Sequence, residues 1–199
     1  MVEAMSHRNR VIELYHKAAT GNKTVRMLLT PVGGLFFTSF VVGIIALSFH
    51  IDRVLNLPKI LFAPWNVLLS VPLLCGGLFL VLWSLLHFVK ARGTPVPFNP
   101  PPRLVASGPY AYTRNPMLTG VFALMFGIGT LLGSVTLVFI FTPLFVGLNV
   151  LHLRAIEEPE LERRLGERYV QYKRETPMFI PRLEAGTKKR PSGRDRACF

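Results

Sequence analysis

The most prominent pattern in the sequence is a set of three long apolar intervals without Asp, Glu, Lys or Arg, at residues 27–51, 60–89 and 115–153. Uncharged apolar runs of about 18 residues or more are typical of transmembrane helices. The third interval is long enough for two spans, and Gly133-Ser134 interrupts it near its middle as a turn would. The pattern therefore predicts an all-α integral membrane helical bundle with about four transmembrane helices, at about 28–49, 65–88, 117–132 and 135–153.

Polar segments flank this bundle at both ends of the chain. Residues 1–26 form a basic arm whose apolar positions recur at helical spacing, which predicts either a short amphipathic helix on the membrane surface or a partly disordered arm. Residues 183–199 are basic and contain Gly, Ser and Pro, a composition typical of disorder. The chain between them, residues 27–182, is expected to form a single membrane domain.

The segment after the last span predicts a C-terminal amphipathic helix on the cytoplasmic side. Leu161, Leu165, Tyr169 and Tyr172 recur at spacings of four, four and three, which lines them along one face of a helix. The opposite face is charged. This helix is expected to dock on its own protein or to lie on the lipid surface.

Glycines inside the spans predict close contacts between helices, because a residue without a side chain lets two backbones approach. Gly129 and Gly133 lie four residues apart, and they do not form a phosphate loop because their spacing is wrong and no strand precedes them. The other glycines expected to make such contacts are Gly33, Gly34, Gly43, Gly76 and Gly77.

Composition and charge agree with a membrane protein. Half of the residues are hydrophobic and 17% are charged, whereas about a quarter are charged in an average soluble domain. The net charge of +12 does not indicate nucleic-acid binding, because the sequence has neither a soluble fold with a basic face nor aromatic residues interleaved with basic ones. A lipid membrane is the expected partner of this charge.

The distribution of Lys and Arg predicts the orientation of the bundle. Of the 23 basic residues, 21 lie in the N-terminal arm, in the stretch 90–116 and in the tail from Arg154 onward. With four spans these three segments lie on one side of the membrane, and the positive-inside rule makes that side cytoplasmic. Both termini are therefore expected in the cytoplasm, in a bacterial inner membrane or in the endoplasmic reticulum.

The candidate functional site combines residues 92–116 with residues 154–182, which this topology brings to the same membrane face. Glu157 and Glu158 follow the last span directly, and carboxylates so close to lipid are costly unless they are paired or functional. They could bind polar groups of a cofactor, or they could pair with Arg114 or Arg154. The five histidines show no metal-ligand spacing, so no metal site is expected.

Two motifs in these segments resemble those of a known family. RLVASGPYAYTRNPMLTG, at 103–120, resembles the G-x-Y-x-x-x-R-H-P-M-Y-x-G signature of the isoprenylcysteine carboxyl methyltransferase and phospholipid methyltransferase superfamily. EEPELERRLGERYVQYKRETPMFIP, at 157–181, resembles that family's E-E-x-x-L-x-x-x-F-G-x-x-Y-x-x-Y…P ending. The resemblance covers about residues 90–182.

This resemblance implies methyl transfer from S-adenosylmethionine, without a metal, to a lipid or another lipophilic acceptor that enters from the bilayer. By analogy Glu157 or Glu158 would bind polar groups of the cofactor, and Arg114 would orient the acceptor or the cofactor carboxylate. The implied catalytic residues are Arg114, Asn115 and Glu158. The implied cofactor-binding residues are Leu104, Val105, Gly108, Tyr110, Arg114, Asn115, Pro116, Glu157 and Glu158.

The sequence departs from the family pattern at Asn115, where the motif has His, and at Leu118, where it has Tyr. Asn cannot accept a proton as a base, so an acceptor must meet another base or arrive ionised. The expected acceptor is therefore an isoprenylcysteine-type carboxylate, with a phospholipid amine second and a small hydrophobic thiol or phenol open. An NADPH-dependent membrane reductase of the related fold and a non-enzymatic helical scaffold are the alternative functions.

Overall fold

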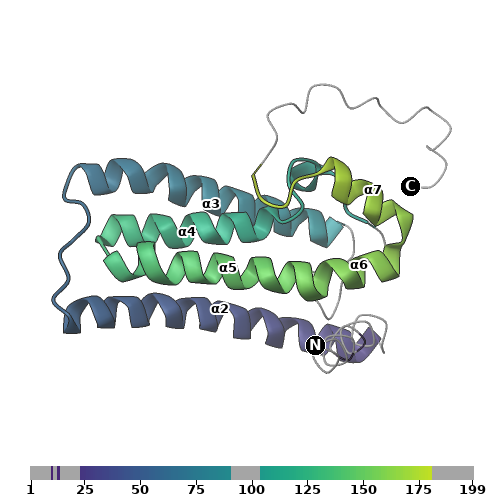
Figure 1. The fold of residues 1–199 in the computed structure, drawn as a ribbon, viewed down its shortest axis with the longest axis horizontal. Helices are drawn as coiled ribbons and strands as arrows, with labels where there is room; N and C mark the ends of the chain where they lie inside the picture. The colour runs from purple at the N-terminus through teal and green to yellow at the C-terminus, as the bar shows by residue number, and fades with distance from the viewer. Residues whose placement is uncertain (1–9, 11–12, 14–22, 91–103, 181–199) are drawn as a thin grey trace.

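The computed structural model describes residues 10, 13, 23–90 and 104–180 (Figure 1). The predictions for most of the N-terminal arm, for residues 91–103 and for the basic tail lie outside the described residues. Within the described part of the chain the secondary structure is entirely helical, so the predicted all-α class is confirmed. The elements are α2 (Lys23–Val54), α3 (Trp65–Lys90), η1 (Gly108–Ala111), α4 (Pro116–Leu132), η2 (Leu137–Phe141), α5 (Thr142–His152), η3 (Leu153–Glu157), α6 (Glu158–Leu165) and α7 (Glu167–Glu175).

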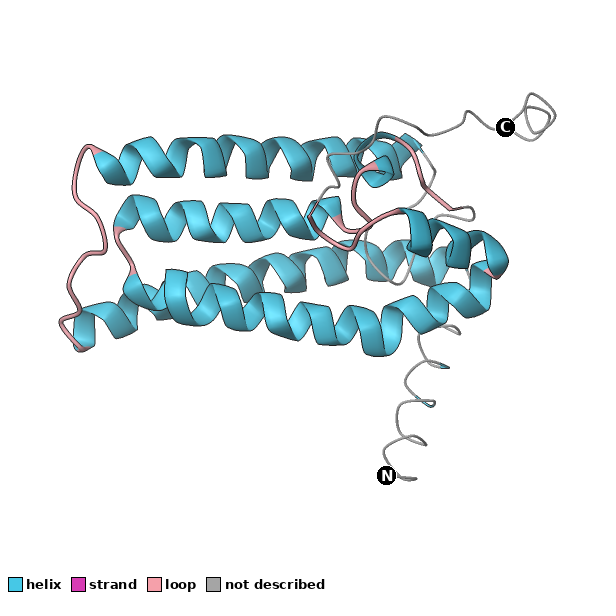
Figure 2. Cartoon of the chain, turned by 45° about the horizontal axis from the view of Figure 1, so that its top comes forward, coloured by secondary structure: helices cyan, strands magenta, loops and turns pink. Residues whose placement is uncertain are grey.

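The long helices run side by side as a bundle, with α4 between α3 and the helix that contains α5, and with α2 packed against that helix (Figures 1 and 2). Three helices are long and apolar enough to cross a membrane, and α4, with 17 residues, is a shorter apolar helix. The three long spans are Thr30–Val54, Trp65–Lys90 and Leu137–Leu165. Apolar helices are thus present at all four predicted positions, and the first and the last extend furthest beyond their predicted ends, to Val54 and Leu165.

The outward faces of the long helices are covered with large apolar side chains. Leu35 and Phe36 on α2, Leu68 on α3, and Phe139 and Leu148 on the last long helix are each more than half exposed. An apolar surface of this extent is not stable in water. It matches the hydrocarbon of a bilayer, and the protein is an integral membrane protein.

The core of the bundle lies between α2, α4 and α5. Phe122 and Met125 of α4 pack with Leu137 and Phe145, and all four side chains are buried. The ring of Phe122 meets the ring of Phe145 edge-on, with 5.8 Å between centroids. Side chains from α2 complete this cluster, among them Phe37, Val41, Ile44, Ile45 and Phe49.

The closest approach of two helices joins α3 and α4 at a pair of glycines. A β-carbon on Gly120 would lie 2.7 Å from the carbonyl oxygen of Gly77, and one on Gly77 would lie 2.8 Å from the carbonyl oxygen of Gly120. The predicted contact at Gly77 is confirmed. The prediction is wrong for Gly34, Gly43 and Gly76, where a β-carbon would meet nothing within 4 Å. On α2 the contacts pass through large side chains instead.

The turn between α4 and the last long helix is the predicted one. Gly133 ends α4 with φ +74°, a left-handed conformation that glycine adopts without strain. Asp52, near the end of α2, accepts hydrogen bonds from the backbone N–H of Thr136 (3.1 Å) and from the hydroxyls of Ser134 and Thr136. A carboxylate at a helix N-terminus satisfies unpaired N–H groups and opposes the helix dipole, so Asp52 fixes this turn to α2.

The prediction of one continuous amphipathic helix after the last span is wrong. The last long helix continues without a break through α6 to Leu165, and the chain then turns at Gly166, which has φ +61° and ψ −144°. This conformation is open to glycine and strained for other residues. The turn directs α7 back along the end of the bundle, where Tyr169 and Tyr172 are buried.

Candidate functional site

Three segments meet at the end of the bundle where α3 ends and α4 begins (Figure 1). They are the loop 104–115 with its short helix η1, the pair α6 and α7, and residues 176–180, which we call the strap. The described parts of the two segments predicted to form a joint site, residues 104–116 and 154–180, are therefore in contact. The joint site inferred from the sequence requires this contact.

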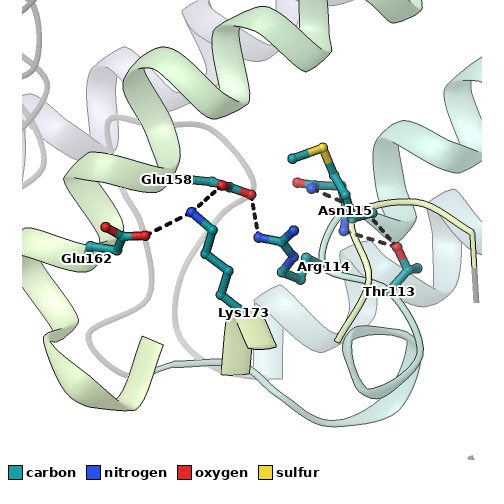
Figure 3. A network of polar contacts seen from close by, with 7 residues as sticks. Thr113, Arg114, Asn115, Glu158, Glu162 and Lys173 are labelled. Carbon is teal, nitrogen blue, oxygen red and sulfur yellow. Dashed lines mark hydrogen bonds and ion pairs between the residues drawn. The ribbon is translucent and has the colours of Figure 1, made fainter. Parts of the chain in front are cut away.

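A cluster of ion pairs, buried at Arg114 and Glu158 and more exposed at Lys173 and Glu162, lies at the centre of this region (Figure 3). One carboxylate oxygen of Glu158 accepts a hydrogen bond from the Arg114 guanidinium. The other is 2.7 Å from the Lys173 ammonium, which also lies 2.9 Å from Glu162. The Glu158 side chain is only 6% exposed, and a buried carboxylate is costly unless cations of this kind compensate it. Of the alternatives that the sequence left open, the pair with Arg114 is present.

The helix geometry explains why Glu158 rather than Glu157 reaches Arg114. Residues Leu153–Glu157 form a π-helical turn, which inserts one extra residue per turn and changes the direction of the side chains that follow. Glu157 is half-buried and lies among the charges of Glu158, Glu160 and Arg164. Single π-helical turns within α-helices occur frequently at functional sites. No feature of the sequence had indicated this one.

The strap holds the loop that carries Arg114. The backbone N–H of Arg114 donates to the carbonyl of Pro177 (2.9 Å), and that of Asn115 donates to the carbonyl of Met178 (3.2 Å). The Met178 carbonyl also accepts from the Thr113 hydroxyl (2.8 Å) and from the Asn115 side-chain amide (3.4 Å). Asn115 therefore acts as a tether at the start of α4.

Pro116 and the strap together fix the position of Arg114 relative to the core. Pro116 is buried as the first residue of α4, where its missing N–H has no helical partner to lose. Phe179 of the strap packs on Phe122 in the core, with 5.5 Å between ring centroids. The Arg114 side chain thus extends from a backbone anchored on both sides.

Three tyrosines line the inner side of the site. The Tyr172 hydroxyl donates to the backbone carbonyl of Tyr110 (2.7 Å) and so joins α7 to η1. Tyr110 packs edge-on against Phe88 of α3. Burial raises the pKa of Tyr110, Tyr169 and Tyr172 well above its ordinary value. These phenols therefore stay neutral.

Tyr172→Phe is expected to lower the free energy of unfolding by about 1–3 kcal/mol, because it leaves the buried Tyr110 carbonyl without its donor. The melting temperature in detergent measures this change. Tyr112→Phe is the matched control, since Tyr112 is half exposed and a surface change of this kind alters stability by less than about 0.5 kcal/mol. Equal melting temperatures for the two variants would contradict the structural role of the Tyr172 hydroxyl.

Of the predicted residues at the start of the loop, Gly108 lies beside α3. Leu104 and Val105 are half-buried, and Gly108 begins η1 with φ +60°. A β-carbon on Gly108 would lie 2.1 Å from Nε2 of His87, so the imidazole occupies the space that a side chain would need. Backbone contacts from these three residues to a cofactor stay a prediction.

Several residues of the site had not been singled out in the sequence, namely Thr113, Glu162, Lys173, Pro177 and Met178. Lys173 and Glu162 are eleven residues apart and meet only because the chain reverses at Gly166. No periodic pattern relates them. The tyrosine spacing was the one available signal, since it indicated a buried face of α7.

The site also contains polar atoms that are buried without a partner among the described residues. They are Nε of Arg114 and the hydroxyl of Thr176. Buried polar groups are almost always hydrogen-bonded, and an Arg Nε–H is suited to a carboxylate oxygen. These donors fit the carboxylate of an amino-acid-derived cofactor. The described residues contain no group of three His, Cys, Asp or Glu side chains that could hold a metal ion.

The sequence profile of a family described as phospholipid methyltransferase matches residues 65–168 of this chain. The matched region spans a little more than half of the chain, and it includes α3, α4, the loop with Arg114 and the helix with Glu158. Comparison with curated proteins gave no match, and comparison with solved structures gave none either.

Proposed function

The chain belongs to the phospholipid methyltransferase family, and we propose that it transfers a methyl group from S-adenosylmethionine to a lipophilic acceptor in the membrane. The observation that carries the proposal is the buried Arg114–Glu158 pair, in which Nε of Arg114 has no partner among the described residues. Membership of the family gives a membrane methyltransferase. The identity of the methyl donor and the acceptor are the parts that we propose.

Bound S-adenosylmethionine would supply a methyl group on a positively charged sulfur, which is already activated for displacement by a nucleophile. The chain then needs to bind, orient and exclude water, rather than to supply strong acid or base chemistry. Arg114 would donate from Nε to the cofactor carboxylate. Glu158 would accept hydrogen bonds from polar groups of the cofactor once the Lys173 ammonium moves away from it. Glu157 would lie close by. The neutral tyrosines would keep the site dry.

The acceptor would reach this site from the bilayer. The site lies at the end of helices whose outward faces are apolar, and this favours an amphipathic acceptor whose polar group lies at the headgroup level. The family description makes a phospholipid amine the first acceptor to test. The isoprenylcysteine-type carboxylate, which the sequence placed first, becomes the second acceptor to test; it stays a candidate because a carboxylate needs no base and Asn115 offers none.

The first experiment is binding by calorimetry to detergent-purified protein, with S-adenosylmethionine and NADPH measured side by side. We expect the first to bind and the second not to bind. Transfer of a labelled methyl group to phosphatidylethanolamine vesicles and to a prenylcysteine analogue then identifies the acceptor. Binding of NADPH alone would replace the proposal with a reductase, and folded protein that binds neither ligand would remove its support.

A further inference from the structure

His87 is an ionisable residue beside the candidate site that the proposed function does not use. It lies in the last turn of α3, half-buried, at the end of the bundle where η1 and the ion pairs lie. Its ring packs edge-on against Trp83, and Trp83 in turn lies 6.5 Å from the ring of Tyr112. Histidine is the side chain that most often serves as a general base.

The hydrogen bond of His87 defines which ring nitrogen is basic. Nδ1 lies 2.9 Å from the backbone carbonyl oxygen of Trp83. A carbonyl oxygen only accepts, so Nδ1 carries the proton, and in the neutral ring Nε2 then holds the free electron pair. A β-carbon on Gly108 would lie 2.1 Å from Nε2, 2.5 Å from Cδ2 and 2.6 Å from Cε1, so the absence of a side chain there leaves room for the ring. The basic nitrogen thus reaches the loop that carries Arg114.

Glu157 competes with His87 as a proton acceptor, because its half-buried carboxylate lies in the same site. Two other polar groups near the loop are less suited to accept a proton. Glu158 is bound by two cations, and the amide of Asn115 donates to the strap. Among the elements packed against α3, η1 contributes the phenol of Tyr110 and is followed by that of Tyr112, and α4 contributes no ionisable side chain. On its own helix the nearest charged residue is Lys90.

The aromatic rings beside His87 suit a cationic headgroup. Tyr112 is about half exposed, with an exposed fraction of 49%, and Trp83 is half-buried. Tryptophan and tyrosine faces attract ammonium groups by cation–π interaction, worth about 0.5–2 kcal/mol. A primary ammonium held on Trp83 and Tyr112 would lie next to the basic nitrogen of His87.

We infer that His87 accepts the proton from a lipid amine as that amine is methylated, an inference that rests on the proposed methyl transfer. The ammonium N–H bond breaks and its proton passes to Nε2, which leaves the nitrogen with a lone pair. That pair forms the new C–N bond, while the electrons of the broken C–S bond stay on the sulfur. The imidazolium later returns its proton to water.

His87→Asn is the variant that tests this inference, because the asparagine amide can still donate to the Trp83 carbonyl while the basic nitrogen is lost. We expect methylation of phosphatidylethanolamine to fall at least about 100-fold, the usual effect of removing a general base. Methylation of a prenylcysteine carboxylate, if the protein carries it out, should be unchanged, since a carboxylate has no proton to lose. The dissociation constant for S-adenosylmethionine should change by no more than about twofold, well below the tenfold change that corresponds to 1.4 kcal/mol.

A second readout does not depend on activity. The ¹⁵N spectrum of the imidazoles in the cofactor-free protein should show His87 with its proton on Nδ1, and the opposite tautomer would overturn the inference.

Equal amine methylation by wild type and His87→Asn would overturn the inference too, as would a wild-type protein that methylates only carboxylates. His50→Asn is the matched control, because His50 lies near the end of α2 that is away from the site (Figure 1). This variant should be fully active. Loss of amine methylation in Glu157→Gln but not in His87→Asn, with binding of S-adenosylmethionine retained, would assign the proton to the Glu157 carboxylate. Wild-type protein that neither binds S-adenosylmethionine nor transfers methyl groups would refute the proposed function itself.

Discussion

Glu158→Met is expected to abolish methyl transfer and to lower the free energy of unfolding by about 3–5 kcal/mol, the usual cost of removing one partner from a buried ion pair. The variant leaves the Arg114 guanidinium, 11% exposed, without its carboxylate. An uncompensated buried charge costs far more than a missing contact. The melting temperature in detergent and the turnover of labelled methyl donor measure the two effects separately.

Arg114→Met should destabilise the protein less than Glu158→Met does. Glu158 would still be paired with Lys173 at 2.7 Å, whereas Arg114 has no second carboxylate among the described side chains. We therefore expect the melting temperatures to rank wild type first, Arg114→Met second and Glu158→Met last. The reverse order of the two variants would show that the Lys173 contact does not support Glu158.

The double variant Arg114→Met/Glu158→Met separates folding from function. Replacing both partners of a buried pair with apolar residues of similar size is often neutral for stability, so the melting temperature should recover toward the wild-type value. Binding of S-adenosylmethionine should stay absent, because both the carboxylate and the guanidinium are gone. A stable double variant that still binds the cofactor would show that the pair is structural and that the binding site lies elsewhere.

The sequence predicted the helices and the two segments of the site, because both depend on local patterns. Uncharged runs identify spans by length alone, and Gly133 terminates α4 with φ +74° as its position in the pattern suggested. The distribution of Lys and Arg predicted that residues 92–116 and 154–182 lie on the same face of the membrane. Arg114, Asn115 and Glu158 were then selected by motif, and two of them form the central pair.

The rest of the site depends on contacts that have no sequence period. The position of Glu158 relative to Glu157 is set by the π-helical turn Leu153–Glu157, and the position of Lys173 is set by the reversal at Gly166. The strap reaches the loop across more than sixty positions of sequence. The sequence does not indicate the role of Asp52, because a carboxylate near the end of a span suggests only where the span ends. Its partners, Ser134 and Thr136, lie at the start of another helix.

The glycines show the same division between pattern and contact. The sequence could indicate which positions permit close approach, but Gly34 and Gly77 look alike in it and differ in the folded chain. At Gly77 the facing residue is another glycine, so the two backbones meet. At Gly34 the space is open, and the contacts of α2 pass through Phe37 and Ile44 instead.

Gly120→Ala is expected to destabilise the protein by about 1–3 kcal/mol, the typical cost of an overpacked methyl group. Alanine normally favours a helix over glycine by about 1 kcal/mol, so the sign of the effect is itself informative. The new β-carbon would lie 2.7 Å from the carbonyl oxygen of Gly77. Backbone cannot move aside as a side-chain rotamer can, so α3 and α4 must separate.

The same change should reduce methyl transfer by more than its effect on stability alone would. Gly120 lies about one turn beyond Pro116, so a shift of α4 moves Asn115 and the loop that carries Arg114. Reacting groups displaced by about 1 Å can lose 100-fold in rate. Gly34→Ala is the matched control, because nothing lies within 4 Å of its β-carbon and the helix should gain stability. If Gly120→Ala and Gly34→Ala raise the melting temperature alike, α3 and α4 do not meet through Gly77 and Gly120.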